Sequence, residues 1–177
     1  GISLPQNSTF ASEIITPSTT SNFPTVFYLN DGTTNNQIIQ YFNNSSGSTA
    51  LGVDVSGSSI IGSGIFPGSF TLGSKGVFTA RISSGVYGAA VNGGAVSTNA
   101  GVGLPIVSRF VIGGKSTGAN QLNGYLQRIA IYPYSALDNE LVYRSIAYRT
   151  FFNLLLDSGS NLLQEDLSFT KLEGYTA

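Results

Sequence analysis

The sequence lacks histidine, cysteine, methionine and tryptophan altogether. Without cysteine there is no disulfide, no thiolate nucleophile and no thiolate metal site, and the sequence carries no signal of the redox compartment. Without histidine, Ser-His-Asp and Cys-His catalytic arrangements and the common zinc sites are excluded. Because methionine is absent, residue 1 is not an untouched translation start, and we expect the chain to be processed or to be part of a longer one.

Charge is also scarce. Eight basic and nine acidic residues make up 10% of the chain and leave a net charge of −1. So small a charge creates no long-range field, and neither nucleic acid nor an anionic membrane surface is favoured as a partner. No apolar run approaches the roughly 20 residues that span a bilayer, and no basic-then-apolar leader is present. We therefore expect a soluble protein with no membrane insertion.

The chain is rich instead in small polar residues and glycine, with 24 serines, 15 threonines, 14 asparagines and 22 glycines. Hydrophobic residues still form 41% of the 177 residues, which is enough for the packed core of one domain. Segments that alternate between apolar and polar residues are separated by Gly, Asn and Ser clusters, a pattern typical of a β-sandwich or barrel. The strands expected in the first half span residues 13–15, 26–29, 37–42, 50–55, 77–82 and 87–91.

Two local features of the later strands predict particular backbone structures, a turn and a β-bulge. Asn92-Gly93 predicts a tight hairpin turn, because both residues tolerate positive φ. After a strand at residues 109–112, a long strand is expected from Leu122 to Tyr132. Leu126, Ile129 and Ile131 cannot share one face of a regular strand, so we predict a β-bulge near Gln127 and Arg128.

Pro133 ends this strand, because proline cannot donate to a β-ladder. Behind it, Ser135 or Asp138 is expected to cap a short helix that extends to about Tyr148, the only helix we expect. The predicted fold is thus all-β, a two-sheet antiparallel sandwich with one short C-terminal helix. The residues predicted to lie between the sheets are Phe78, Ala80, Ile82, Tyr87, Val91, Phe110, Ile112, Ile129 and Ile131.

The segment from Arg109 to Gly113, the polar loop after it and the stretch from Leu122 to Pro133 resemble the end of a concanavalin A-like, laminin-G-like jelly roll. More narrowly, the chain is similar to the version found in bacteriophage tail and other virion proteins. In that version a paired-Gly hairpin, as at residues 91–94, leads to a proline before the glycine-terminated strand, as at Leu104-Pro105. The resemblance covers about residues 2–148 and implies a jelly-roll domain over residues 1–149.

The resemblance also implies a function: a non-enzymatic structural domain on the surface of a virion, in a tail, fibre or capsid decoration, whose partners are other virion proteins or copies of itself. Residues 150–177 have no counterpart in the family and form the densest apolar stretch of the chain. We expect this extension to pack against another subunit or virion protein, since large apolar patches usually mark interfaces. The alternative is that it adds strands to its own sandwich.

Catalysis is not expected. Glycosidases of this architecture use two carboxylates, in the family's spacing Glu-x-Asp-x-x-Glu, which does not occur here. Asp54 alternates with Leu51, Val53 and Val55, so we expect its side chain to face solvent, or a groove if the sheet is concave. A lone carboxylate cannot supply both acid and base, so we predict that the protein is not an enzyme.

The alternative function is a carbohydrate-binding module that recognises host-surface glycans. Sugar sites on such sandwiches combine aromatic rings with amide side chains, because sugars offer apolar faces and hydroxyl edges. The candidates are Asn120, Gln121, Asn123, Tyr125, Tyr132 and Tyr134, although each tyrosine could equally be plain strand packing. Asn30, Asp31, Asn35 and Asn36 form a dense cluster of side-chain oxygens that suits calcium, and the same residues are typical of a turn, which is the interpretation we favour. No other cofactor is expected.

Overall fold

The structure is a computed structural model of the chain. It describes residues 7–16, 23–43, 48–56, 58–59, 64–101, 103–115 and 120–146. Contacts divide the chain into two units, Gly1–Ala147 and Tyr148–Ala177, and all described residues belong to the first. The apolar extension at residues 150–177, which we predict to be an interface, lies outside the described residues.

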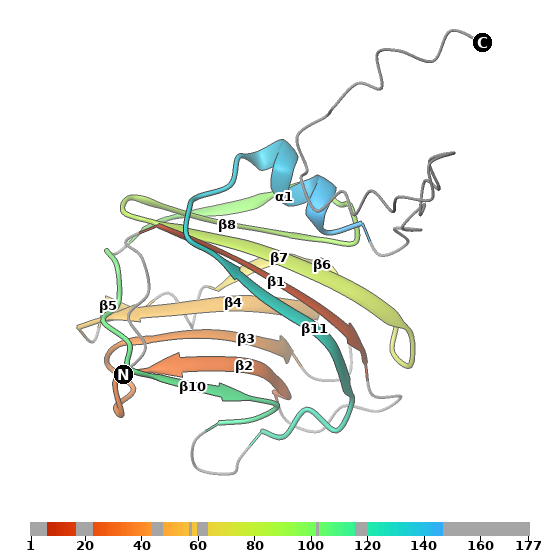
Figure 1. Ribbon diagram of the computed structural model, residues 1–177, viewed down its shortest axis with the longest axis horizontal. Helices are drawn as coiled ribbons and strands as arrows, with labels where there is room; N and C mark the ends of the chain where they lie inside the picture. The colour runs from red at the N-terminus through yellow and green to blue at the C-terminus, as the bar shows by residue number, and fades with distance from the viewer. Residues whose placement is uncertain are drawn as a thin grey trace, which may run out of the picture. The chain divides into compact units, whose positions relative to one another are not determined.

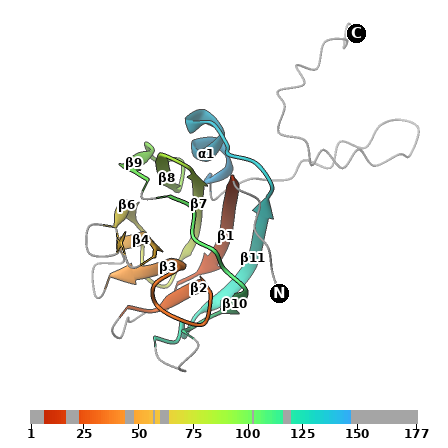
Figure 2. The ribbon, with the colours of Figure 1, turned by 90° about the vertical axis from the view of Figure 1, so that its left-hand side faces the viewer.

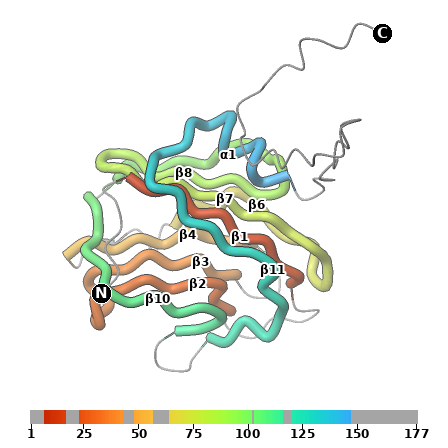
Figure 3. Tube along the Cα trace, in the orientation of Figure 1, coloured from red at the N-terminus to blue at the C-terminus, as the bar shows by residue number. Residues whose placement is uncertain are grey.

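The first unit contains two antiparallel sheets (Figure 1). Sheet A has the strand order β11-β1-β7-β8-β9, so the first strand of the chain lies between two later ones. The Cα trace shows β1 in this position, between β7 and β11 (Figure 3). The strands of sheet A are β1 (Ser8–Ile15), β7 (Lys75–Ser83), β8 (Val86–Val91), β9 (Ser97–Ala100) and β11 (Tyr125–Tyr132).

Sheet B has the order β10-β2-β3-β4-β5, and β6 also pairs with β4. Its strands are β2 (Thr25–Asn30), β3 (Gln37–Asn43), β4 (Ser48–Val55), β5 (Ser58–Ser59), β6 (Ile65–Ser69) and β10 (Arg109–Ile112). Figure 2 shows the two sheets facing one another. The short strands β5, β6 and β9 were not expected, because serine- and glycine-rich segments carry no clear alternation.

The hydrophobic core fills the space between the sheets. Five predicted core residues of β7 and β8 are buried there, and three on β10 and β11 pack against it. These are Phe78, Ala80, Ile82, Tyr87 and Val91, then Phe110, Ile129 and Ile131. The prediction is wrong for Ile112, which is 51% exposed, because it is the last residue of the edge strand β10.

The predicted β-bulge is confirmed. Glu13 of β1 lies opposite Arg128, whereas the next residue, Ile14, lies opposite Leu126, so Gln127 has no partner on β1. The extra residue brings Leu126 onto the same face as Ile129 and Ile131, and all three pack against the core. The strand itself begins later than expected, at Tyr125, because Asn123 has a φ of 48° and breaks the extended backbone before it.

The turn at Asn92-Gly93 differs from the expected tight hairpin. Both residues have positive φ, 50° and 77°, as predicted. However, the Asn92 N–H donates to the Val77 carbonyl, and the Val77 N–H donates to Asn92 Oδ1. These bonds hold the turn against β7. The connection from β8 to β9 therefore takes residues 92–96, and the prediction of a two-residue hairpin turn was wrong.

Helix α1 (Asp138–Arg144) lies on the outer face of sheet A, where Leu141 packs with Ala90 and Ala136. Capping by Ser135 or Asp138 was wrong: Leu137 is the N-cap and makes no side-chain cap bond. Asp138 instead pairs with Arg81 of β7 at 2.5 Å. The helix ends at Arg144, and residue 148, the predicted end, lies outside the described residues. None of the described helical segments is long and apolar enough to cross a membrane.

Candidate functional site

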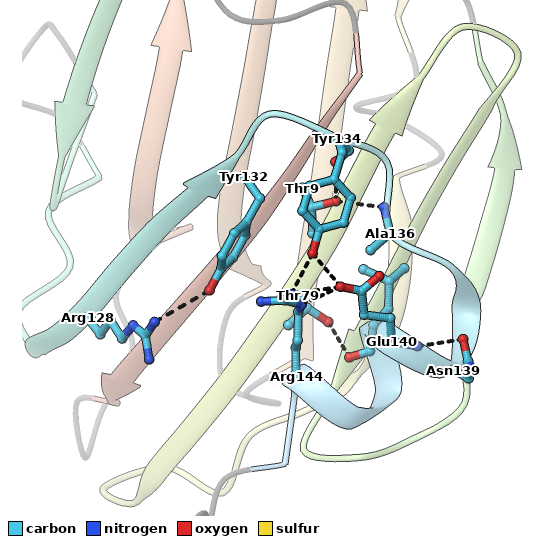
Figure 4. A network of polar contacts seen from close by, with 10 residues as sticks. Thr9, Thr79, Arg128, Tyr132, Tyr134, Ala136, Asn139, Glu140 and Arg144 are labelled. Carbon is cyan, nitrogen blue, oxygen red and sulfur yellow. Dashed lines mark hydrogen bonds and ion pairs between the residues drawn. The ribbon is translucent and has the colours of Figure 1, made fainter. Parts of the chain in front are cut away.

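Two of the predicted tyrosines belong to a polar network between β11 and α1 (Figure 4). The guanidinium carbon of Arg144 lies 4.2 Å from the ring centroid of Tyr132 and 5.8 Å from that of Tyr134. Arg144 also donates to the Tyr134 hydroxyl and, through Nε at 2.9 Å, to Glu140. The Tyr134 hydroxyl donates to the same carboxylate. Both rings therefore already bind a cation of their own chain.

The groups of this network shift the pKa values of Tyr134 and Glu140 in the directions that keep their hydrogen bond. Burial, followed by the hydrogen bond to Glu140, raises the pKa of Tyr134 to about 12, against the opposing charge of Arg144. Burial alone would raise the pKa of Glu140, but the bonds from Tyr134 and Arg144 and the charge of Arg144 outweigh it, so this pKa is lowered. When the Tyr134 phenol is protonated and the Glu140 carboxylate is charged, these bonds hold α1 against sheet A.

The other four predicted residues lie at the opposite end of β11. Tyr125 begins this eight-residue strand and Tyr132 ends it, which places them about 23 Å apart at the usual rise per residue. Asn120, Gln121 and Asn123 precede Tyr125 in the loop. The predicted set is thus two separate groups, too far apart to bind one small sugar together.

We call Gln121, Asn123 and Tyr125 the 121–125 surface. All three residues are exposed, and Tyr125 is 73% exposed. The loop is anchored at both sides: the Thr25 N–H donates to the Asn120 carbonyl at 2.8 Å, and the Leu122 N–H donates to the Gly113 carbonyl at 2.9 Å. No described residue bonds to the two side-chain amides or to the phenol, so these groups are open to a ligand.

Among the calcium candidates, the side-chain oxygens of Asn30 and Asp31 accept hydrogen bonds from the loop itself. The Asp31 carboxylate accepts from the Thr33 N–H at 2.8 Å, from the Thr33 hydroxyl at 2.6 Å and from Asn36 Nδ2 at 2.8 Å. These bonds, that of the Thr33 hydroxyl first, lower the pKa of Asp31. Asn30 Oδ1 accepts from Gly32, and the Asn35 N–H donates to Thr33. The contacts favour the turn interpretation, and the described residues hold no cluster of three Asp or Glu side chains.

A row of polar side chains crosses the outer face of sheet B. Asn30 of β2 lies opposite Gln37 of β3, which lies opposite Asp54 of β4. We call these three residues the polar row. Arg109 of β10 continues it to the edge of the sheet. The row points away from the core, because the adjacent residues Leu29, Ile38 and Val53 point into it.

The polar row is buried, although it lies on an outer face. Asn30, Gln37 and Asp54 are 1%, 5% and 5% exposed, so the expectation that Asp54 faces solvent was wrong. Gln37 Nε2 donates to Asp54 Oδ2. The remaining side-chain atoms Asn30 Nδ2, Gln37 Oε1 and Asp54 Oδ1 have no hydrogen-bond partner among the described residues. Sequence reasoning missed Gln37, because its place beside Asp54 depends on the register between β3 and β4. It missed Arg109, because β10 pairs with β2 although the two strands lie far apart in the chain.

Neither a known protein-family model nor a curated protein matches the sequence. Solved structures do match the fold. The CBM40 module of the Ruminococcus gnavus IT-sialidase, bound to α2,3-sialyllactose, is 13% identical, with a TM-score of 0.66 over 80% of this chain and 84% of that one.

Two further structures come from animals. The heptameric SAP-like pentraxin of Limulus polyphemus is 21% identical, with a TM-score of 0.57 over 79% of this chain and 70% of that one. Domains LG4-5 of the mouse laminin α1 chain are 10% identical, with a TM-score of 0.59 over 78% and 39%. All three are jelly-roll sandwiches of the concanavalin A-like type, which confirms the predicted fold class.

Proposed function

We propose that this domain is a non-catalytic carbohydrate-binding module that recognises a glycan through the 121–125 surface. The observation that carries the proposal is the ring of Tyr125, 73% exposed at the start of an edge strand beside two amides with no described partner. An exposed aromatic ring offers an apolar face for a sugar ring, and side-chain amides donate to and accept from its hydroxyl groups. The anchored loop holds these groups in place before a ligand arrives.

Comparison with known structures supports the ligand class. The CBM40 module was solved bound to sialyllactose. At 13% identity this likeness concerns the fold, so the choice of sugar in this chain depends on its own residues. A host-surface glycan is the ligand class that we propose. No catalytic role is proposed, because the chain lacks histidine and cysteine and carries no paired carboxylates in the glycosidase spacing.

A place on a virion is a separate part of the proposal. It depends on the resemblance of residues 91–94, 104–105 and 109–133 to bacteriophage tail domains. The three structures named above are not virion proteins, so this location stays a prediction. Immunogold labelling of particles with an antibody against the domain would test it, and particles without label would contradict it.

The test of the 121–125 surface starts with a glycan array, followed by titration calorimetry on the glycan bound. We expect Tyr125→Ala to weaken binding about tenfold or more, which corresponds to about 1.4 kcal/mol. Tyr125→Phe keeps the ring and should stay within about threefold, because the stacking face is unchanged. Leu137→Ala is the matched control, since Leu137 is 69% exposed beside α1, away from this surface.

Two results would contradict the proposal. One is an array on which the folded protein binds no glycan. The other is a glycan whose affinity is the same for Tyr125→Ala and for Leu137→Ala, which would show binding elsewhere on the domain.

A further inference from the structure

The dipeptide Asn-Gly occurs twice in the sequence, at Asn92-Gly93 and at Asn123-Gly124. Such a pair is able to modify itself. The backbone nitrogen of the glycine attacks the side-chain carbon Cγ of the asparagine, which it reaches easily because glycine has no side chain to shield it. A five-membered succinimide ring forms, the bond from Cγ to Nδ2 breaks, and ammonia leaves with the proton from the backbone nitrogen.

Water completes the reaction by opening the ring. Attack on one ring carbonyl leaves aspartate in the normal backbone, and attack on the other leaves isoaspartate, whose backbone runs through the side chain. In both cases the asparagine amide and one water become a carboxylic acid and ammonia, without oxidation or reduction. The reaction requires a free backbone N–H and a side chain that is able to turn toward it.

The two Asn-Gly pairs start from nearly the same conformation. The φ of Asn92 is 50° and that of Asn123 is 48°. Both asparagines are exposed, and both glycines are half-buried. A difference in reactivity between the pairs therefore depends on the hydrogen bonds that hold the reacting groups.

The reacting groups of Asn92-Gly93 are held on both sides. The Gly93 N–H, which is the attacking group, donates to Ser145 Oγ at 2.9 Å. Asn92 Oδ1 accepts from the Val77 N–H at 2.9 Å, so the side chain is held in place as well. Ring closure would break both bonds, and each bond adds to the barrier.

The reacting groups of Asn123-Gly124 are open. No described residue accepts from the Gly124 N–H or bonds to the Asn123 amide. The anchors of the loop lie on either side of the pair: the Leu122 N–H donates to the Gly113 carbonyl at 2.9 Å, and Tyr125 is paired within sheet A. Ring closure at this pair breaks no bond to a described residue.

We propose that Asn123 is a site of spontaneous deamidation in the folded protein, and that the fold protects Asn92 from the same reaction. The modification adds a negative charge to a chain whose net charge is −1. Its consequence for recognition rests on the proposed function: Asn123 belongs to the 121–125 surface, and a carboxylate accepts hydrogen bonds but donates none. Deamidation would therefore weaken glycan binding as the protein ages.

The test incubates the full chain at mildly alkaline pH, in native buffer and in concentrated urea, and measures both sites by peptide mass spectrometry. In native buffer we expect Asn123 to react at least about tenfold faster than Asn92, because two hydrogen bonds protect Asn92. In urea the two rates should become similar, since unfolding removes these bonds. Equal rates in native buffer, or no reaction at Asn123 there, would overturn the proposal.

Two variants act on the attacking groups separately. Gly124→Ala shields the backbone nitrogen and should stop the reaction at residue 123; the φ of Gly124 lies outside the left-handed region, so alanine suits this position. Ser145→Ala removes the acceptor of the Gly93 N–H and should speed the reaction at Asn92 about fivefold. An unchanged rate at Asn92 in a folded Ser145→Ala variant, checked by circular dichroism, would contradict protection by this hydrogen bond.

Asn123→Asp tests the consequence for binding, by titration calorimetry with the glycan found on the array. The loss of one donor should weaken its affinity about fivefold. Equal affinity of the variant and the wild type would overturn this consequence and leave the deamidation site in place. A wild-type protein that binds no glycan would contradict the proposed function, and the two deamidation rates would still decide the modification.

Discussion

Arg144 makes three kinds of contact where α1 meets sheet A. Its guanidinium stacks on Tyr132, bonds to Tyr134 and pairs with Glu140. A solvent-exposed ion pair alone stabilises a protein by about 0–1 kcal/mol, and a cation over an aromatic ring adds about 0.5–1 kcal/mol. The Arg144 side chain is only 9% exposed, so these contacts are shielded and act together. The same contacts occupy two tyrosines that sequence alone presents as sugar platforms.

The raised pKa of Tyr134 gives a test at alkaline pH. Its folded-state pKa is about 12, above the ordinary value of 10. A phenol with a raised pKa contributes stability that is fully present below pH 10 and is lost as pH rises through 12. We expect the free energy of unfolding to fall across this window, measured by urea denaturation at a series of pH values.

Tyr134→Phe is the control for this effect. It removes the titrating group but keeps the ring under Arg144, so its stability should fall less between pH 10 and pH 12 than that of the wild type. The remaining slope comes from other tyrosines, since burial also raises the pKa of Tyr28 and Tyr41. Parallel curves for the two proteins would show that Tyr134 does not contribute.

At the scale of the element, β11 contains a single extra residue. Gln127 has no partner on β1, and the bulge around it lets Leu126 face the core together with Ile129. We expect deletion of Gln127 to leave Leu126 opposite Ile14 and facing the core, because Leu126 then lies two positions before Ile129 in a regular strand. No buried apolar side chain is lost, so the free energy of unfolding should stay within about 1 kcal/mol of that of the wild type, measured by urea denaturation.

Gln127→Ala is the matched control, because it keeps the bulge and changes only an exposed side chain. It should stay within about 0.5 kcal/mol of the wild type. A loss of about 1.5–3 kcal/mol in the deletion variant would contradict this expectation, because it would mean that Leu126 had left the core.

The bulge and the core of β7 and β8 could be predicted because their signals are local. Phe78, Ala80 and Ile82 alternate without interruption, and the spacing of Leu126, Ile129 and Ile131 permits only an irregular strand. The structure differs from the prediction where a local feature depends on residues distant in the sequence. The length of the connection after Asn92 is set by its bonds to Val77, fifteen residues earlier, which no local pattern shows.

The polar row was harder to predict than the 121–125 surface, whose three residues the sequence itself singles out. The sequence singled out Asp54, yet both faces of the central strands β2, β3 and β4 are buried, so alternation does not tell the inner face from the outer. Burial on both faces gives Asn30, Gln37 and Asp54 the surroundings of core residues. Their alignment appears only when the register of three strands is known.

On the scale of the whole sandwich, the two outer faces differ. Helix α1 covers part of the outer face of sheet A, with Leu141 buried against β8. The outer face of sheet B carries the polar row beside an apolar cluster of Tyr28, Ile39, Tyr41 and Ala50. The two outer faces therefore differ in what lies on them: a helix on sheet A, and polar and apolar side chains of the strands themselves on sheet B.

The apolar extension gives a prediction about assembly. A chain that ends at Ala147 retains every described residue, so we expect it to keep the far-UV circular dichroism of the sandwich. If the extension is an interface, the molar mass by light scattering should be lower than that of the full chain, by at least half for a dimer.

Two outcomes would contradict this prediction. Unfolding of the shortened chain would show that residues 148–177 belong to the core of the sandwich. A full chain that is already monomeric would show that the extension does not assemble the protein with copies of itself.

Because β1 lies between β7 and β11, sheet A can be completed only after nearly the whole domain has been synthesised. The Thr9 hydroxyl donates to the Tyr134 carbonyl, 125 residues later, and accepts from the Ala136 N–H, 127 residues later. Closing so long a loop is entropically costly, and contacts of this kind slow folding. During synthesis β1 therefore waits with one edge unpaired until β11 has left the ribosome. Nascent chains shorter than this expose strand edges, which is the form most open to aggregation and to chaperone binding.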